Sequence, residues 1–176
     1  MRTTGIVRRI DELGRVVIPK EIRRTMRLRD GEELEIFLEN QNELVFKKYS
    51  PVKTIKSFSD EYCGILSETT GNTVIVCDKD TVVAAAGEKK SVYAGKAVTP
   101  LFEREIDVRR ALIFSGSGIF SVAGEKIEDV KGQIVAPILS RGDVLGAVVM
   151  ISYKSEFDES DLKLCTAAAA FLGCQA

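Results

Sequence analysis

Over the first fifty residues, short apolar runs alternate with charged turns, a pattern typical of strands and hairpins rather than of long helices. GIVRRI at 5–10 and RVVI at 15–18 are rich in β-branched side chains and predict two short strands. DELG at 11–14 predicts the turn between them, because Gly14 tolerates a positive φ. The chain therefore begins with a predicted strand–turn–strand unit.

A short helix and a hairpin complete this first region. Pro19 suits the first helical position, and the following apolar spacing predicts a helix over 19–28. ELEIFLE at 33–39 and ELVFKKY at 43–49 alternate between apolar and polar side chains, which predicts two strands joined by the turn NQN. A region this short buries little surface and leaves strand edges unpaired. We therefore expect it to pair with a second copy as a symmetric dimer.

The pattern changes at KKYSPVKT, residues 47–54, where Pro51 stops the preceding strand. We predict two domains, residues 1–53 and residues 54–176. The second begins with a helical pattern over 54–71, in which the apolar positions are Ile55, Phe58, Tyr62, Ile65 and Leu66.

The rest of the second region predicts antiparallel strands with helical segments. Residues 72–87 predict a hairpin around DKD, and residues 132–152 predict two apolar strands around SRGD. The stretch 91–124 predicts a partly helical segment followed by glycine-rich strands and turns. Asp158 is an N-cap candidate for a terminal helix, whose alanines at 167–170 would let another helix approach closely. The expected fold class is α+β, with two domains.

The amino-acid composition limits the kinds of catalysis, metal binding and membrane association that the chain can support. The 176 residues include no histidine, which removes the usual general base and the commonest transition-metal ligand. No apolar run approaches the roughly 18 residues of a spanning helix, and MRTTGIVRRI lacks a signal-peptide core. We expect a cytoplasmic protein that is not an enzyme and has no metal, cofactor or membrane partner. A disulfide scaffold or zinc site is disfavoured because no CxxC pair occurs among Cys63, Cys77, Cys165 and Cys174.

The net charge of −1 hides an uneven distribution. Residues 1–53 hold 12 Lys and Arg against 9 Asp and Glu, whereas residues 54–176 hold 13 against 17. Within residues 1–30 the count is 9 against 4, and eight of the nine cations are arginine. Arginine is the planar, multi-donor cation that suits phosphates and guanine edges. A charge run alone is usually a solvated face, but this clustering of arginine favours nucleic acid.

TGIVRRIDELGRVVIPKEIRRTMRLRDGEELEIF, followed by LVFKKYSP, resembles the AbrB family of swapped-hairpin DNA-binding domains over residues 1–52. The resemblance implies a β-barrel dimer in which hairpins of two chains interleave. It also implies binding of double-stranded DNA through arginines of the first strand, the LGR turn and the short helix. Carried onto this sequence, the DNA-binding residues are Arg8, Arg15, Arg23 and Arg24, with Arg9 and Lys20 nearby.

VAPIL…GDVLGAVVMIS resembles the end of a GAF domain, and the resemblance extends over roughly residues 54–176. It implies an antiparallel sheet with flanking helices, in a fold that encloses small ligands in some relatives. The chain lacks an NKFDE-like motif, which speaks against a cyclic nucleotide. Two interpretations stay open with equal weight: a sensor of an unknown small molecule, and a ligand-free domain for oligomerisation and surface regulation.

These patterns together predict a nucleoid-associated transcription regulator that assembles as a swapped dimer and then as a homotetramer. The whole-chain plan resembles sporulation regulators of endospore-forming bacteria, which implies control of late sporulation genes as activator and repressor. Two alternatives belong to other classes. One is a nucleoid-structuring protein of weak sequence preference, and the other is a small-molecule sensor whose basic N-terminus serves assembly. A GAF-based enzyme is a distant fourth, because no catalytic constellation is present.

Overall fold

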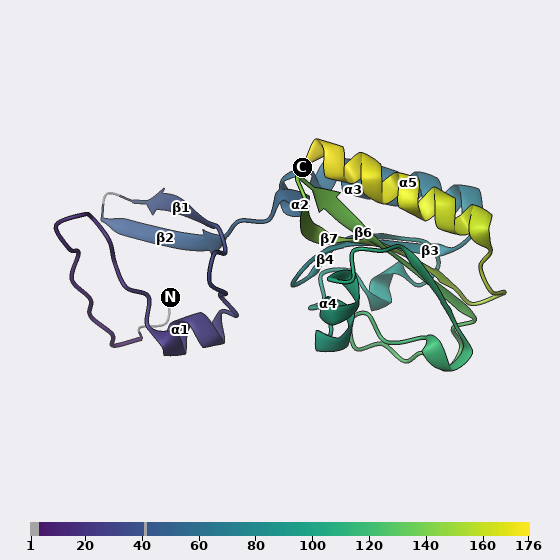
Figure 1. The fold of residues 1–176 in the computed structure, drawn as a ribbon, viewed down its shortest axis with the longest axis horizontal. Coiled ribbons are helices and arrows are strands. Elements are labelled where there is room, and N and C mark those ends of the chain that lie inside the picture. Colours follow the sequence, from purple (N-terminus) through teal and green to yellow (C-terminus); the bar gives the residue numbers. More distant parts are fainter. Residues whose placement is uncertain (1–3, 41) are drawn as a thin grey trace. The chain divides into compact units, whose positions relative to one another are not determined.

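The chain divides into two compact units in the computed structural model, which describes residues 4–40 and 42–176 (Figure 1). The first unit is Met1–Tyr49 and the second is Ser50–Ala176. The division comes before the boundary predicted after residue 53, because Val52 is fully buried in the core of the second unit. In the first unit, the Tyr49 amide donates a hydrogen bond to the Glu33 carbonyl at 3.0 Å.

The first unit contains one short helix and one hairpin. Helix α1 spans Lys20–Thr25, and the antiparallel strands β1 (Leu34–Glu39) and β2 (Glu43–Lys48) pair from Leu34 opposite Lys48 to Glu39 opposite Glu43. The predicted helix and hairpin strands are therefore confirmed. The predicted turn at 40–42 includes residue 41, which lies outside the described residues.

The two strands predicted at 5–10 and 15–18 do not form in this chain, so that prediction is wrong for the single molecule. Both stretches are irregular, and at the turn between them the Asp11 amide donates to the Arg15 carbonyl at 3.0 Å. A strand needs a neighbouring strand to take up its backbone hydrogen bonds, and among the described residues neither stretch is paired with a strand. Pro19 is the N-cap of α1 rather than its first residue, because its ψ of 148° is extended.

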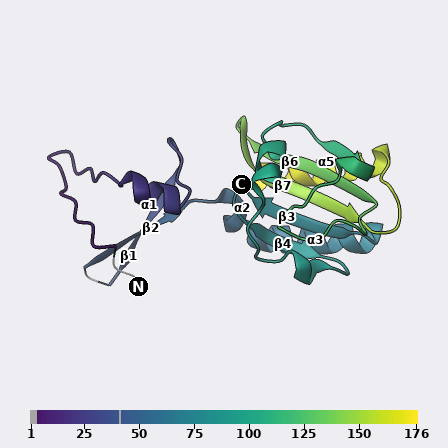
Figure 2. The same cartoon turned by 90° about the horizontal axis from the view of Figure 1, so that it is seen from below.

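The second unit is built on a five-stranded antiparallel sheet in the order β4–β3–β7–β6–β5, whose strands β6, β7, β3 and β4 lie side by side in Figure 2. Both predicted strand pairs are confirmed. The 113–124 stretch contributes only β5 and the 3₁₀ turn η2, not a second strand. The elements are β3 (Thr73–Asp78), β4 (Val82–Ala86), β5 (Leu112–Ser115), η2 (Gly116–Gly118), β6 (Gly132–Ser140) and β7 (Asp143–Ser152).

Helices cover both faces of this sheet. On one face, α3 (Lys56–Thr70) and α5 (Glu159–Gln175) lie side by side, preceded by the single turn α2 (Pro51–Thr54) (Figures 1 and 2). The other face carries α4 (Pro100–Ile106) and the 3₁₀ turn η1 (Lys90–Val92). Asp158 caps α5 as predicted, since its carboxylate accepts the amides of Ser160 and Asp161.

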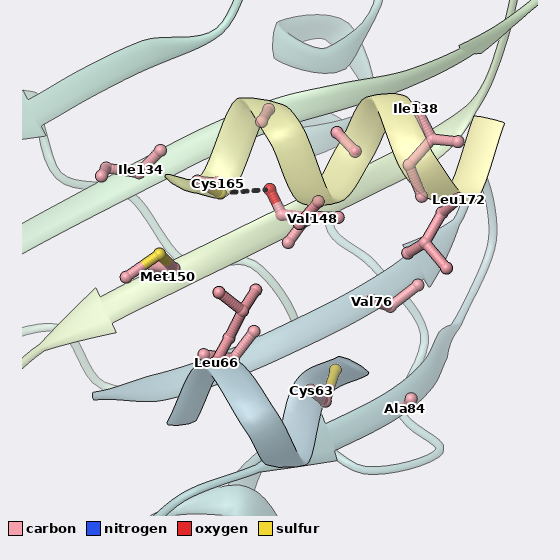
Figure 3. Packing of buried hydrophobic residues seen from close by; sticks show 14 of the residues in the cluster. Cys63, Leu66, Val76, Ala84, Ile134, Ile138, Val148, Met150, Cys165 and Leu172 are labelled. Carbon is pink, nitrogen blue, oxygen red and sulfur yellow. Dashed lines mark hydrogen bonds between the residues drawn. The ribbon is translucent and has the colours of Figure 1, made fainter. Parts of the chain in front are cut away.

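The core under α3 and α5 follows the two-residue alternation of the strands. Val76, Val148 and Met150 face the two helices, which contribute Leu66 and Leu172 among others (Figure 3). Because successive side chains of a strand point to opposite faces, one set packs under the two helices and the other set packs in a second core on the opposite face of the sheet.

The apolar positions predicted for the first helix of this unit do not all face the sheet. Phe58 and Ile65 are exposed to solvent, and Ile55 is the N-cap of α3 rather than part of it. In α5, Ala168 and Ala169 are buried against the sheet core, whereas Ala167 and Ala170 are exposed, so the close approach of another helix stays a prediction. Helical spacing identified the element but not the side that meets the sheet.

The second core lies on the opposite face and is filled by aromatic side chains. Ile75 and Val149 of the sheet pack in one cluster with Tyr93, Phe102 and Phe120. Phe102 is fully buried, and the rings of Phe102 and Phe120 lie 6.3 Å apart between centroids. The loop after η2 is fixed here by the side-chain amide of buried Gln133, which bonds both the amide and the carbonyl of Phe120.

Candidate nucleic-acid interface

The turn between the two extended stretches of the first unit is organised by one carboxylate. Asp11 Oδ1 accepts the amides of Leu13 and Arg15 at 3.0 and 2.8 Å, and Asp11 Oδ2 accepts Arg15 Nε at 2.7 Å. The hydrogen bonds from the Arg15 backbone and side chain hold the pKa of Asp11 below its usual value. Gly14 takes the positive φ of 75° that the sequence predicts for it. The role of Asp11 was not predicted from the sequence, although an Asp four residues before an Arg is a recognisable spacing.

Helix α1 carries three of the predicted DNA-binding residues. Lys20 begins the helix, and Arg23 and Arg24 lie in its last turn. Because Lys20 and Arg24 are four positions apart, they share one side of the helix. Arg23 Nη1 donates to Asp30 Oδ1 at 2.9 Å, in a pair whose carboxylate is almost fully exposed. Ion pairs this exposed contribute little to stability, so a phosphate can replace the Asp30 partner at small cost.

The turn that ends α1 contains an arginine, Arg27, with an unusual backbone conformation. The Leu28 amide donates to the Arg23 carbonyl at 2.7 Å, which closes the helix, and Arg27 takes a φ of 52° between them. Glycine is the residue that usually occupies this position. Arg27 is exposed and was not among the predicted site residues.

The structure brings the six predicted cations together in two groups within the first unit. Arg8 and Arg9 lie in the extended stretch before the turn, with Arg15 directly after it, and all three are exposed. Arg8 Nη1 donates to the neighbouring Val7 carbonyl at 3.0 Å. The second group is Lys20, Arg23 and Arg24 on α1, of which Arg23 is half-buried. Both groups present their charge to solvent, as a polyanion-binding surface requires.

The first unit also presents most of its apolar side chains to solvent. The buried hydrophobic residues of the described chain begin only at Val52. In the first unit, Val7, Leu13 and Leu38 are 85%, 74% and 82% exposed, and both strands of the hairpin carry exposed apolar residues. An apolar surface this extensive on so small a unit is typical of an interface rather than of a finished domain.

The second unit offers fewer groups for chemistry. Tyr93 and Tyr153 share a hydrogen bond of 2.7 Å, and Lys89 Nζ lies 4.0 Å from the centre of the Tyr153 ring. Burial raises the pKa of the Tyr93 hydroxyl, so it stays protonated at neutral pH. Burial also raises the pKa of the Cys63 thiol to about 12, so this thiol stays protonated at neutral pH.

The part of the chain that the structure describes has neither a cluster of metal-ligating side chains nor a membrane-spanning helix. Across residues 4–40 and 42–176, His, Cys, Asp and Glu side chains nowhere gather in a group of three or more that would hold a metal ion. Over the same ranges, no helix combines the length and the apolar character needed to cross a bilayer.

Comparison with known proteins places these features in a family. Residues 54–176 match the family model described as stage V sporulation protein T C-terminal, transcription factor. Stage V sporulation protein T of Bacillus subtilis (strain 168) is 42% identical over 175 residues, which cover 99% of this chain and 98% of the relative. The chain belongs to the stage V sporulation protein T family of transcription factors. The family resemblance predicted from the sequence is thereby confirmed.

The N-terminal region of this chain also matches a second family model and a second regulatory protein. Residues 7–54 match the family model described as antidote-toxin recognition MazE, bacterial antitoxin. The transition state regulatory protein AbrB of Bacillus subtilis (strain 168) is 34% identical over 92 residues, which cover 52% of this chain and 86% of AbrB. The predicted AbrB resemblance of the first region therefore holds at the level of sequence.

The second unit of the family member has a GAF-like fold, as predicted. It is similar to the cofactor-binding GAF domain of the nutrient sensor CodY from Clostridium difficile, with a TM-score of 0.55 and 20% identity over 65% of this chain and 81% of that chain. It is also similar to a type II free methionine-R-sulfoxide reductase from Thermoplasma acidophilum, with a TM-score of 0.56 and 16% identity over 70% and 94%. At these identities the likeness describes the fold alone.

Proposed function

We propose that this chain is a transcription regulator that binds double-stranded DNA through the first unit, with Arg8, Arg9, Arg15, Lys20, Arg23 and Arg24 as the contacting cations. The observation that carries the proposal is the placement of the predicted cations in two groups, one flanking an ordered turn and one on a short helix. Arg15 and Arg23 are each held by an exposed carboxylate that phosphate can displace. Phosphate contacts supply affinity, and arginine also reads guanine edges in the major groove.

The DNA-binding form is a dimer with interleaved hairpins and a shared β-barrel. The exposed apolar residues of the first unit support this assembly, because a second copy would remove them from water. The irregular stretches at 5–10 and 15–18 support it as well, since a partner chain can provide the strand neighbours that the single chain lacks. Residues 1–53 form the DNA-binding domain of this dimer, and the dimer brings two sets of arginines onto one surface.

The second domain, residues 54–176, joins two dimers into a tetramer through the outer face of α3 and α5. Phe58, Ile65, Leu164 and Phe171 are exposed on these neighbouring helices. The Phe171 ring stacks on Tyr62 of α3, with 5.1 Å between centroids, so apolar side chains of the two helices meet at this point. An apolar surface of this kind on a helix pair suits packing against an equivalent pair.

The regulator acts in the cytoplasm on late sporulation genes, as activator at some and repressor at others. The relationship to a protein named for a stage of sporulation supports this role. The proposal assigns no enzymatic activity to the chain. Sensing of a small molecule by the GAF-like domain and ligand-free assembly remain two versions of the same proposal, and both place regulation in the second domain.

The decisive experiment compares a fourfold alanine variant of Arg8, Arg15, Arg23 and Arg24 with the wild type on promoter DNA and on random DNA over a range of salt. A matched control replaces four exposed arginines of the second unit by alanine: Arg104, Arg109, Arg110 and Arg141. Removing an arginine that binds a phosphate should lower the slope of log affinity against log salt by about 1, and removing one that binds a base should cost about 1–3 kcal/mol. The control variant should keep wild-type affinity.

Three results would contradict parts of the proposal. Full affinity in a folded fourfold variant would remove these arginines from the interface. Equal affinity of the wild type for promoter and random DNA would favour the nucleoid-structuring alternative. An absence of DNA binding by the wild type at low salt would favour the sensor whose basic region serves assembly.

A further inference from the structure

The turn that follows helix α1 carries an arginine at a position where the backbone favours glycine. Met26 is the C-cap of α1, and the next residue, Arg27, has a φ of 52°. The Arg27 amide donates to the Arg24 carbonyl at 3.2 Å, and the Leu28 amide donates to the Arg23 carbonyl at 2.7 Å. This pair of backbone bonds is a common C-terminal closure of a helix, in which the residue after the cap is left-handed and is usually glycine.

The strain at Arg27 is not offset by contacts of its own side chain. Among residues 4–40 and 42–176, the exposed Arg27 side chain forms neither a hydrogen bond nor an ion pair. Glycine would make the same backbone bonds in a conformation that costs it less. The benefit of an arginine at this position therefore lies outside the folded single chain, as is typical of strained residues that contact a ligand.

Two other arginines of the first unit differ from Arg27 because carboxylates hold them. Arg15 Nε lies 2.7 Å from Asp11 Oδ2, and Arg23 Nη1 lies 2.9 Å from Asp30 Oδ1. A guanidinium in a fixed orientation suits the two acceptors of a guanine edge. A guanidinium that is free to rotate suits a phosphate, whose oxygens accept hydrogen bonds from many directions. The surroundings of Arg27 are therefore those of a phosphate contact.

The charge of Arg27 adds to a concentration of positive charge around the end of α1. Residues 23–29 contain Arg23, Arg24, Arg27 and Arg29 and no acidic residue. The bond between the Arg27 amide and the Arg24 carbonyl keeps two of these residues next to each other. Like charges at this spacing repel one another in the free chain, and a polyanion that binds beside them relieves the repulsion.

We infer that Arg27 contacts a phosphate of double-stranded DNA beside the cations of helix α1, and that this contact accounts for an arginine at a position suited to glycine. The inference rests on the proposed DNA-binding function and adds a contact to the six cations named there. Phosphates are common to all duplexes, so the contact provides affinity but little discrimination between sequences. A gain in folded stability and a loss of DNA affinity should therefore follow from the same substitution.

Three variants of the full chain test this inference. Arg27→Gly removes the charge and relieves the strain, whereas Arg27→Lys keeps the charge. Arg141→Gly is the matched control, because Arg141 is exposed between β6 and β7 with a φ of 50° and undergoes the same change of charge and backbone freedom. Analytical ultracentrifugation should give the wild-type mass for all three. A smaller assembly for Arg27→Gly would assign Arg27 to a subunit interface and overturn the inference.

The binding measurement uses duplexes that the wild-type chain selects from a random-sequence pool, together with unselected duplexes. At about 0.05 M salt, Arg27→Gly should lower the affinity for both kinds of duplex by about tenfold. The slope of log affinity against log salt should fall by about 1 for each Arg27 that touches the duplex. Arg27→Lys and Arg141→Gly should keep the wild-type affinity within about threefold, because a lysine also binds phosphate.

Hydrogen exchange of a peptide covering residues 20–30 measures the strain without DNA. Exchange should be about fivefold slower in Arg27→Gly than in the wild type, and faster exchange would overturn the inference. Wild-type affinity and salt slope in Arg27→Gly would overturn it while leaving the proposed function intact. A loss confined to the selected duplexes would also overturn it, because a base contact would then replace the phosphate contact. An absence of DNA binding by the wild type would overturn the proposed function and this inference together.

Discussion

Gly146 of β7 is the residue at which the structure predicts the largest effect of a single added methyl group. A Cβ at Gly146 would overlap the Cys77 carbonyl oxygen and lie 2.9 Å from the Asp78 Cα. Both neighbours are backbone atoms of β3, which is bonded on its two sides to β4 and β7. A backbone in the middle of a sheet cannot move away as a flexible side chain can.

Gly146→Ala should therefore lie at the upper end of the range for overpacking, at about 3 kcal/mol. For a domain of this size, about 4 °C of melting temperature corresponds to each kcal/mol, so we expect a loss of about 12 °C. Differential scanning calorimetry of the full chain at one fixed concentration would measure it, because assembly makes the melting temperature depend on concentration.

The matched control for this substitution is Gly64→Ala in α3. An added Cβ at Gly64 meets no heavy atom within 4 Å, and its φ lies outside the left-handed region. Alanine is favoured over glycine inside a helix, so this variant should gain about 0.5–1 kcal/mol. A loss below about 4 °C for Gly146→Ala, or equal losses for the two variants, would refute the argument from backbone overlap.

Three further predictions concern titration, reactivity and backbone strain. Burial would raise the pKa of Asp78, but the hydrogen bonds from its neighbours and the Lys53 charge outweigh burial and lower this pKa. The stability that the Asp78 carboxylate contributes is therefore present above its unfolded pKa and lost on acidification. Asp78→Asn should flatten the fall in unfolding free energy between about pH 5 and 3, measured by urea denaturation. At pH 8 a thiol reagent should label exposed Cys174 in the native chain and leave Cys63 unlabelled until denaturant is added, and rapid labelling of Cys63 would contradict its burial. Arg27→Gly should raise the stability of the first unit by about 1 kcal/mol, because glycine relieves the strain of the φ of 52° at this position. Arg109→Gly should do the same in the second unit. A loss of stability in either variant would show that these arginines make contacts that outweigh the strain.

Local signals predicted the elements whose cause lies close by in the chain. The β6–β7 hairpin and the capped start of α5 followed from apolar runs around SRGD and from Asp158. The GAF-like fold, by contrast, was predicted from the resemblance of VAPIL…GDVLGAVVMIS to the end of a GAF domain. These features depend on hydrogen bonds and alternation within a few residues, which a sequence displays directly.

Other features depend on partners that are distant in the sequence or belong to another chain. DKD at 78–80 predicted a turn, but the burial of Asp78 depends on Ser50, and nothing near Asp78 indicates that contact. The predicted strands at 5–10 and 15–18 did not form, because β propensity describes a residue and not the presence of a neighbouring strand. Arg15 was predicted as a site residue because the AbrB resemblance implies DNA contact by the arginine of the LGR turn, whereas the Asp11 carboxylate that orients it was overlooked.

The absence of buried hydrophobic residues from the described part of the first unit has a consequence for the timing of regulation. Chains that complete each other's core by interleaving can separate only by unfolding, so subunit exchange is as slow as unfolding itself. In the proposed interleaved dimer, newly made chains would then assemble with one another, and older assemblies would persist unmixed until they are degraded or diluted by growth. The activity of such a regulator at a given moment would therefore record when its chains were synthesised as well as how many are present.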